Sequence, residues 1–155
     1  MKRDEVLAEV HKMAGALLES GGECPPVLLI EDQDGDWVLC DIQMTDKLKR
    51  VWSTILPLLL REVCAKGYIM ATEAWMASFP KGTEPPEELT KGKIKISDLP
   101  PDDRQEILFV VSVVKGKSVS VLTSPIRNAP SGKSLGDLTA LSQEEVEGRL
   151  LVKDW

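Results

Sequence analysis

Two long segments of this chain are apolar on both of the faces that an extended strand presents. Apolar residues fill odd and even positions alike over 68–79, and they do so again over 106–114. A strand with one face in water alternates apolar and polar residues, so these two segments need cover on both faces. The first could also be an edge strand that a partner covers. The chain must therefore supply covering helices or use a second molecule.

Two other segments have the helical period that such cover requires. Apolar residues recur at the i, i+3, i+4, i+7 spacing of one helical face over 3–20. They do so again from residue 45 or 46 to residue 67, where Thr or Asp can cap the helix start. A glycine pair at 21–22 ends the first helix, because glycine enters the left-handed cap conformation cheaply. Pro57 lies inside the second helix and predicts a kink, since proline removes a backbone donor.

Short apolar runs around turn residues predict two β-hairpins. The first joins 27–30 to 37–42 through an Asp-Gly turn, and the second joins 106–114 to 118–123 through Lys-Gly-Lys. A short amphipathic helix at 142–151, with Ser and Glu in capping-box positions, is expected to close the fold.

Two stretches predict irregular structure. Residues 80–103 are rich in proline and charge and are long for a connection inside a compact domain. The alternation Lys-Ile-Lys-Ile at 93–96 favours a short edge strand within that loop. The segment 127–155 is expected to be a loop, over 128–136, followed by the closing helix.

Together these elements predict one α+β domain over residues 1–155, in the order α-β-β-α-β-β-β-α. Hairpins keep successive strands adjacent, which gives a five-stranded antiparallel sheet with helices packed on it. The order resembles the roadblock/profilin-like architecture, and that resemblance implies the strand order 2-1-5-4-3. Members of that class often dimerise through the helix after the first hairpin and the strand that follows it.

A second resemblance is local. The segment Glu-Ala-Trp-Met at 73–76, then a proline- and acid-rich loop, then Arg-Gln-Glu-Ile-Leu at 104–108, resembles small uncharacterised proteins of prokaryotes and their phages. The resemblance implies no known activity. It marks Glu73 and Trp75 as positions of interest.

Charge and cysteine usage favour a cytoplasmic protein that binds neither nucleic acid nor a membrane. The net charge is −6, whereas nucleic-acid binders usually have a basic face. The three cysteines are widely spaced without a CxxC pair, which fits neither a disulfide framework nor a zinc site. No apolar run approaches the ~20 residues of a membrane span. No metal or other cofactor is expected.

Three motifs lack a part that their chemistry needs. The acidic turn 32–36 has its glycine in fourth place, whereas an EF-hand loop needs it in sixth place. The run Ser-Gly-Lys-Ser at 131–134 lacks the first glycine of a phosphate-binding loop, since Arg127 occupies that position. His11, the single histidine, falls beside the apolar stripe of the first helix, which predicts a surface or boundary position.

Glu73 is the most unusual residue, because it places a carboxylate in an otherwise apolar strand. Burying an unpaired carboxylate costs several kcal/mol, so this one needs a partner, water or a cleft. One interpretation is a salt bridge to a neighbouring element. The other is a site carboxylate with Trp75 as an apolar wall, working with a second acid such as Glu31, Asp41 or an acid of the long loop.

The leading hypothesis is a non-enzymatic interaction or scaffold module that acts as a homodimer, with Trp52, Trp75 and Met76 as candidate interface residues. One alternative is a hydrolase that uses Glu73 and a second carboxylate, with a divalent ion if needed. Another is a nucleic-acid accessory protein that uses three lysines at 91, 93 and 95. Trp155 either docks on the domain or presents an exposed aromatic to a partner.

Overall fold

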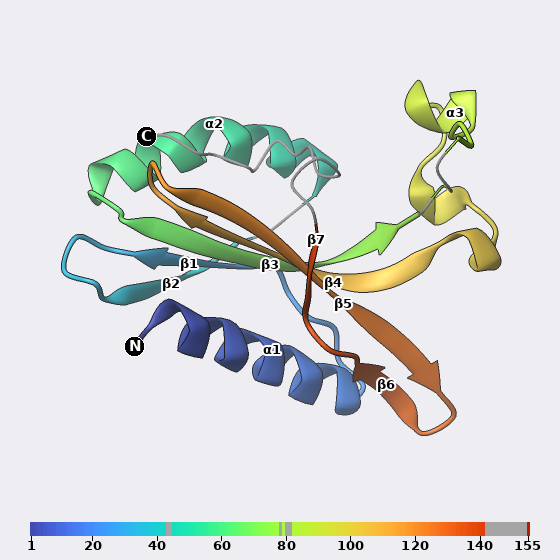
Figure 1. Cartoon of the computed structure of the whole chain (residues 1–155), viewed down its shortest axis with the longest axis horizontal. Helices are drawn as coiled ribbons and strands as arrows, with labels where there is room; N and C mark the ends of the chain where they lie inside the picture. The colour runs from blue at the N-terminus through green and yellow to red at the C-terminus, as the bar shows by residue number, and fades with distance from the viewer. Residues whose placement is uncertain (43–44, 78, 80–81, 142–154) are drawn as a thin grey trace.

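The computed structural model describes residues 1–42, 45–77, 79, 82–141 and 155 (Figure 1). Its two long helices are α1 (Arg3–Glu19) and α2 (Asp46–Glu62). Its strands are β1 (Val27–Glu31), β2 (Trp37–Asp41), β3 (Gly67–Met76), β4 (Gln105–Val114), β5 (Ser118–Ala129), β6 (Gly132–Leu135) and β7 (Thr139–Leu141). The predicted closing helix, 142–151, lies outside the described residues.

All pairs of neighbouring strands are antiparallel, and the sheet runs β2-β1-β3-β4-β5-β6, with β7 paired to β5 as well. The α+β class is therefore confirmed. The predicted order 2-1-5-4-3 was wrong, because β1 pairs with β3. The predicted count of five strands was wrong, because β6 and β7 also pair with β5. Pairing between distant strands depends on the whole chain, and local periodicity carries no information about it.

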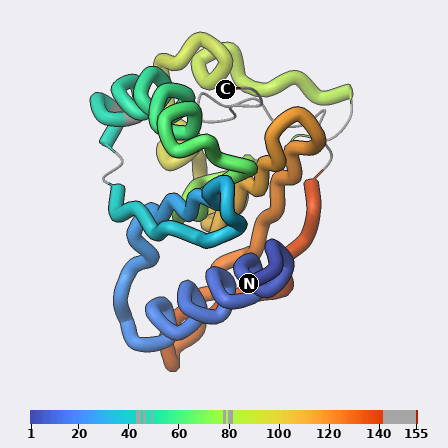
Figure 2. Tube along the Cα trace, turned by 90° about the vertical axis from the view of Figure 1, so that its left-hand side faces the viewer, coloured from blue at the N-terminus to red at the C-terminus, as the bar shows by residue number. Residues whose placement is uncertain are grey.

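One long helix covers each face of the sheet (Figures 1 and 2). The α1 face buries a cluster that includes Leu18, Ile69 and Val110. The α2 face buries a second cluster that includes Leu60, Tyr68 and Val113. Because β3 and β4 lie inside the sheet with a helix on either side, both of their faces are apolar.

Both helices end in the hydrogen-bond pattern of a Schellman motif. In α1 the left-handed position is Gly21, as the sequence predicts, and the N–H of Gly22 donates to Leu17 O. In α2 that position is Cys64 (φ 51°), three residues before the predicted stop, and the N–H of Ala65 donates to Leu60 O. The helix continues through Pro57. Among the described residues, no helix is long and apolar enough to cross a membrane.

Two segments predicted as irregular are partly ordered. The described part of 80–103 forms a helical turn α3 (Glu87–Thr90) and two 3₁₀ turns, η1 (Ile96–Asp98) and η2 (Pro101–Asp103). The edge strand predicted at 93–96 is absent, because the N–H groups of Lys93 and Ile94 turn back to Glu88 O. The loop predicted at 128–136 is mostly a hairpin between β5 and β6.

Candidate functional site

Glu73 lies on the α1 face of β3, just beyond the point where β1 stops pairing with that strand. Its Oε1 accepts a hydrogen bond of 2.9 Å from the backbone N–H of Cys24. Cys24 is buried in the connection between α1 and β1, and its Sγ donates to Ala14 O. The carboxylate therefore ties this connection to the sheet through a main-chain donor.

A lysine lies among the carboxylates near Glu73. Lys133 of β6 places its Nζ 3.2 Å from Oε1 of Glu106, which lies opposite Trp75 on β4. The hydrogen bond to Glu106 is the first cause that raises the pKa of Lys133, and the negative charges of Glu73 and Glu23 add to it. The direct ion pair of this cluster belongs to Glu106, while the charge of Glu73 acts from farther away.

Two of the second carboxylates considered from the sequence, Asp41 and Glu31, lie away from Glu73. Asp41 is two strands away on β2, and Glu31 lies at the other end of the sheet, bound to Arg3. Glu87 of the long loop pairs with Lys91 instead. Across the described part of the chain, no three His, Cys, Asp or Glu side chains are grouped as a metal site.

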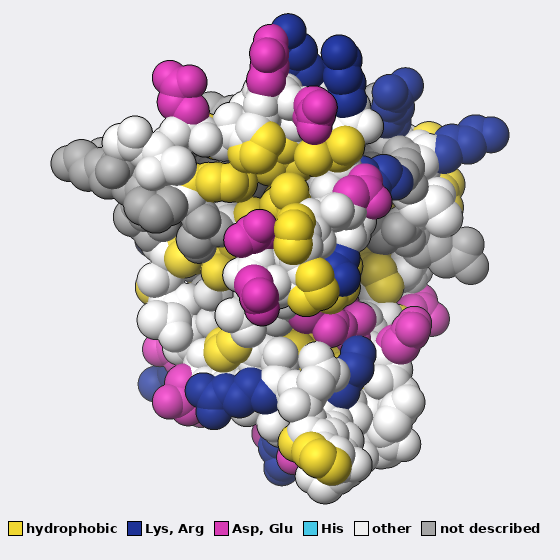
Figure 3. Space-filling view, turned by 90° about the vertical axis from the view of Figure 1, so that its right-hand side faces the viewer, with side chains coloured by type: hydrophobic (Ala, Val, Ile, Leu, Met, Phe, Trp, Pro, Cys, Tyr) yellow, Lys and Arg dark blue, Asp and Glu magenta, His cyan; other side chains and the backbone are white. Residues whose placement is uncertain are grey.

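Two of the three candidate interface residues, Trp75 and Met76, lie at the end of β3, and the third, Trp52, lies on α2. Trp75 is 40% exposed near the end of β3, with the guanidinium of Arg104 stacked 4.5 Å from its ring centroid. Arg104 also donates to Ser97 O, which fastens the long loop to the sheet. Met76 is half-buried at the strand end, and Trp52 packs against the core under α2. Figure 3 shows this end of the molecule, where apolar side chains form a band flanked by acidic and basic ones.

The single histidine has a structural partner. The Nε2 of His11 lies 3.2 Å from Ser124 Oγ and 3.0 Å from Gly136 O. Ser124 is fully buried and donates to the same carbonyl at 2.6 Å. A serine without solvent access cannot attack a substrate, so this pair holds the segment after β6 against α1.

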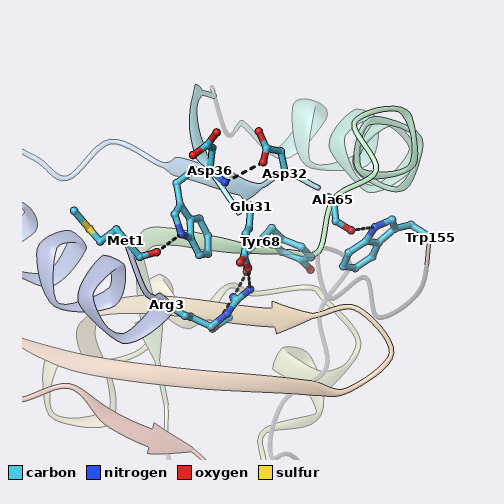
Figure 4. A network of polar contacts seen from close by, with 10 residues as sticks. Met1, Arg3, Glu31, Asp32, Asp36, Ala65, Tyr68 and Trp155 are labelled. Carbon is cyan, nitrogen blue, oxygen red and sulfur yellow. Dashed lines mark hydrogen bonds and ion pairs between the residues drawn. The ribbon is translucent and has the colours of Figure 1, made fainter. Parts of the chain in front are cut away.

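A polar network that no sequence pattern predicted lies at the opposite end of the sheet (Figure 4). Arg3 donates to Glu31 Oε2 at 2.8 Å, to Ser112 Oγ at 3.0 Å and to Tyr68 O at 3.3 Å, so it links β1, β4 and β3. Its guanidinium also lies 5.0 Å from the Trp37 ring centroid. No sequence motif predicts that Arg3 links these strands, because its acceptors lie 28 to 109 residues away in sequence.

Trp155 docks beside this network. Its indole N–H donates to Ala65 O at 2.9 Å, and its ring lies 6.0 Å from that of Tyr68. Of the two alternatives open for this residue, docking is the one in the structure. Lys115 Nζ lies 5.8 Å from the Trp155 ring centroid on the side of the β4–β5 turn.

An open hollow of about 840 Å³ lies at this end of the sheet. It is lined where the start of α1, the β1–β2 turn, the α2–β3 connection and the β4–β5 turn come together. The lining residues are Arg3, Glu31, Gln33, Arg61, Cys64, Ala65, Lys66, Val114, Lys115 and Lys117. We refer to this feature as the basic hollow, since five of these residues are cationic and one is acidic.

An apolar surface follows the β2 edge of the sheet. In β2, Val38 is 49% exposed on the α2 face and Leu39 is 62% exposed on the α1 face. On α2, Val51, Ile55 and Leu58 are between 42% and 57% exposed. We call these five side chains the edge surface.

No family model matches the sequence, and no curated protein or solved structure is significantly similar to it. The function must therefore be argued from the chain's own geometry. The described residues offer three features for that purpose: the Glu73 cluster, the basic hollow and the edge surface.

Proposed function

We propose that this chain is an interaction module that works as a homodimer, and that two copies join through their β2 strands. The observation that carries the proposal is an apolar strand at the edge of the sheet, with no further strand paired to its outer side in the described part of the chain. Natural edge strands usually carry lysine, proline or a bulge that prevents pairing with another chain. The sequence of β2, Trp-Val-Leu-Cys-Asp, has none of these.

The strand register shows which groups of β2 are available. Asp32 N donates to Asp36 O, and hydrogen-bonded pairs alternate along an antiparallel ladder. Val38 and Cys40 therefore bond to β1, while the N–H and C=O groups of Trp37, Leu39 and Asp41 point away from the sheet. A strand from another molecule can therefore form main-chain hydrogen bonds with these three residues of β2.

A two-fold axis at Leu39 satisfies these groups with a copy of the same strand. Leu39 then faces Leu39 of the partner, and Trp37 faces the partner's Asp41, for about six main-chain hydrogen bonds. Val38 faces the partner's Cys40 on the α2 face. The pairing puts apolar side chains opposite one another and keeps the two Asp41 carboxylates apart, which favours a second copy over an unrelated strand.

Helix α2 extends the apolar surface beyond the strand. Val51, Ile55 and Leu58 occupy i, i+4 and i+7, about a third of a turn from the residues that face the core. Helix α2 packs on the sheet, and its C-terminal end, with Arg61, lies at the basic hollow. Because an α-helix is right-handed, this direction of the chain turns the flank with Val51, Ile55 and Leu58 toward the side of the sheet on which β2 lies. Figure 2 shows α2 and the β1–β2 hairpin on the same side of the molecule.

The other two hypotheses have less support. A hydrolase that uses Glu73 needs a second carboxylate that shares a proton or a water with it. The neighbouring carboxylate is that of Glu106, and it forms an ion pair with the Lys133 ammonium instead. A nucleic-acid accessory role rests on the lysines of the long loop, and Lys91 is paired with Glu87.

An engineered disulfide tests the register. Val38 and the partner's Cys40 would form a non-hydrogen-bonded pair, with Cα atoms ~4.5 Å apart, and that spacing suits a disulfide. In a Cys64→Ser background, Val38→Cys should give a covalent dimer under mild oxidation. Val38→Cys with Cys40→Ser is the matched control and should stay monomeric on a non-reducing gel.

A charge substitution tests affinity. Leu39→Lys removes two apolar side chains from the centre of the dimer, at ~1.5 kcal/mol each, so it should weaken dimerisation about 100-fold. Asp34→Lys, at the tip of the same hairpin, should leave it unchanged. A wild-type monomer by light scattering at tens of micromolar, with no Val38→Cys crosslink, would overturn the proposal.

A further inference from the structure

The charge of the basic hollow is opposite to that of the whole chain. Five cationic side chains line it, from Arg3 and Arg61 to three lysines at 66, 115 and 117, in a protein of net charge −6. The single lining carboxylate, Glu31, is already engaged by Arg3 at 2.8 Å. Gathering like charges raises the local potential and costs stability, and an anion in the hollow relieves that cost.

The four cations other than Arg3 have no carboxylate within ion-pair distance in the part of the chain that the structure describes. The acids of the neighbouring turn do not supply one. Asp32 lies beside the hollow, but its Oδ1 accepts the N–H groups of Asp34 and Asp36 within the turn. None of these three acids is a lining residue. Among the described residues, Glu31 is therefore the single acid that lines the hollow, and its net positive charge can attract an anionic ligand.

The backbone around the cations is fixed before any ligand arrives. Lys66 N donates to Glu31 O at 2.8 Å, Lys115 N donates to Lys66 O at 2.9 Å, and Lys117 N donates to Val114 O at 3.0 Å. Arg3 is held by three acceptors, and it fits beside β3 because position 67 is glycine. A Cβ at Gly67 would lie 2.2 Å from Nη2 of Arg3. The backbone bonds fix the main chain from which the lysine side chains extend, and only the entropy of those side chains is then lost when an anion binds.

We propose that the basic hollow binds a small phosphate-bearing molecule. Arginine and lysine are the side chains that proteins use for phosphate, and arginine binds phosphate oxygens in bidentate fashion. At about 840 Å³ the hollow is as large as ordinary small-molecule sites and larger than one phosphate needs. A diphosphate or a phosphorylated metabolite fits that volume. The ring of Trp155 lies 5.8 Å from Nζ of Lys115, so an aromatic ring stands beside one of the lining cations.

Titration with inorganic pyrophosphate in low salt tests the proposal, with isothermal calorimetry as the readout. We expect one site per chain and an affinity that falls as salt rises. Arg61→Gln combined with Lys117→Gln should weaken binding at least tenfold, because both side chains are exposed lining cations. Lys91→Gln combined with Lys93→Gln removes the same charge from the α3 segment and should leave binding unchanged.

Cys64 provides a second readout, because it is an exposed thiol in the lining. Pyrophosphate should slow its alkylation by iodoacetamide, and the Arg61→Gln/Lys117→Gln variant should lose this protection. The proposal fails if pyrophosphate does not bind, if both double variants bind alike, or if duplex DNA competes at equal affinity. The Leu39→Lys chain should still bind pyrophosphate, so failure of the dimer and failure of this site are distinguishable.

Discussion

Replacing Arg3 by methionine tests whether one side chain holds three strands together. The change keeps a long unbranched stem but removes three hydrogen bonds, to Glu31, Ser112 and Tyr68 O. A hydrogen bond to a charged group contributes ~1.5–3 kcal/mol, and each buried acceptor left unpaired adds a desolvation cost. Ser112 is buried, whereas the Glu31 side chain is 23% exposed and regains water. We therefore expect the free energy of unfolding to fall by about 3 kcal/mol.

Urea denaturation followed by circular dichroism, at one fixed protein concentration, measures the change. Lys12→Met is the control, since it also replaces a cationic side chain by methionine, on the exposed side of α1. It should lower the free energy of unfolding by less than about 0.5 kcal/mol. A double-mutant cycle with Glu31→Gln should give a coupling energy of about 1 kcal/mol for the partly exposed ion pair. An Arg3→Met loss no larger than that of Lys12→Met would show that the strands do not depend on this network.

Two further outcomes concern cysteines. Cys64→Gly should stabilise the chain by about 1 kcal/mol in urea denaturation, because glycine adopts the left-handed conformation at φ 51° without strain; unchanged or lower stability would contradict this. Burial, and then Glu73, raise the pKa of Cys24 to about 11. The folded state then keeps a proton that the unfolded state loses, so stability should fall between about pH 9 and 11, and Cys24→Ser should remove that part of the fall. Equal slopes for Cys24→Ser and the wild type would contradict it.

The sequence predicted the features that depend on neighbouring residues. Both long helices, the Gly21 cap and the two hairpins follow from periodicity and turn chemistry. The hairpin between β5 and β6 was missed because its second strand, Gly-Lys-Ser-Leu, does not alternate apolar and polar residues. It is held by register with β5 and by its packing beside α1. These are tertiary effects that override weak local propensity.

The sequence predicted less of the Glu73 cluster, the basic hollow and the edge surface. Glu73 was singled out as a carboxylate in an apolar strand, and its main partner, the backbone N–H of Cys24, is 49 residues away. The cations of the basic hollow come from two helices and two chain connections, so no spacing rule unites them. Residues 37–42 were predicted as a strand, but only the sheet order shows that β2 is the edge strand among the described strands.

The edge surface and the basic hollow lie close together in one chain, whereas the proposed dimer keeps the hollows of its two copies apart. Trp37, at the start of β2, lies beside Glu31 and the basic hollow, while Asp41 lies at the far end of the strand. An antiparallel pairing about Leu39 therefore brings the hollow end of one copy next to the Asp41 end of the other. The two hollows then lie at opposite ends of the joined sheet, and one small ligand cannot bridge them. Ligand binding should consequently follow a single-site isotherm, and its affinity should not change across the protein concentrations at which the dimer forms.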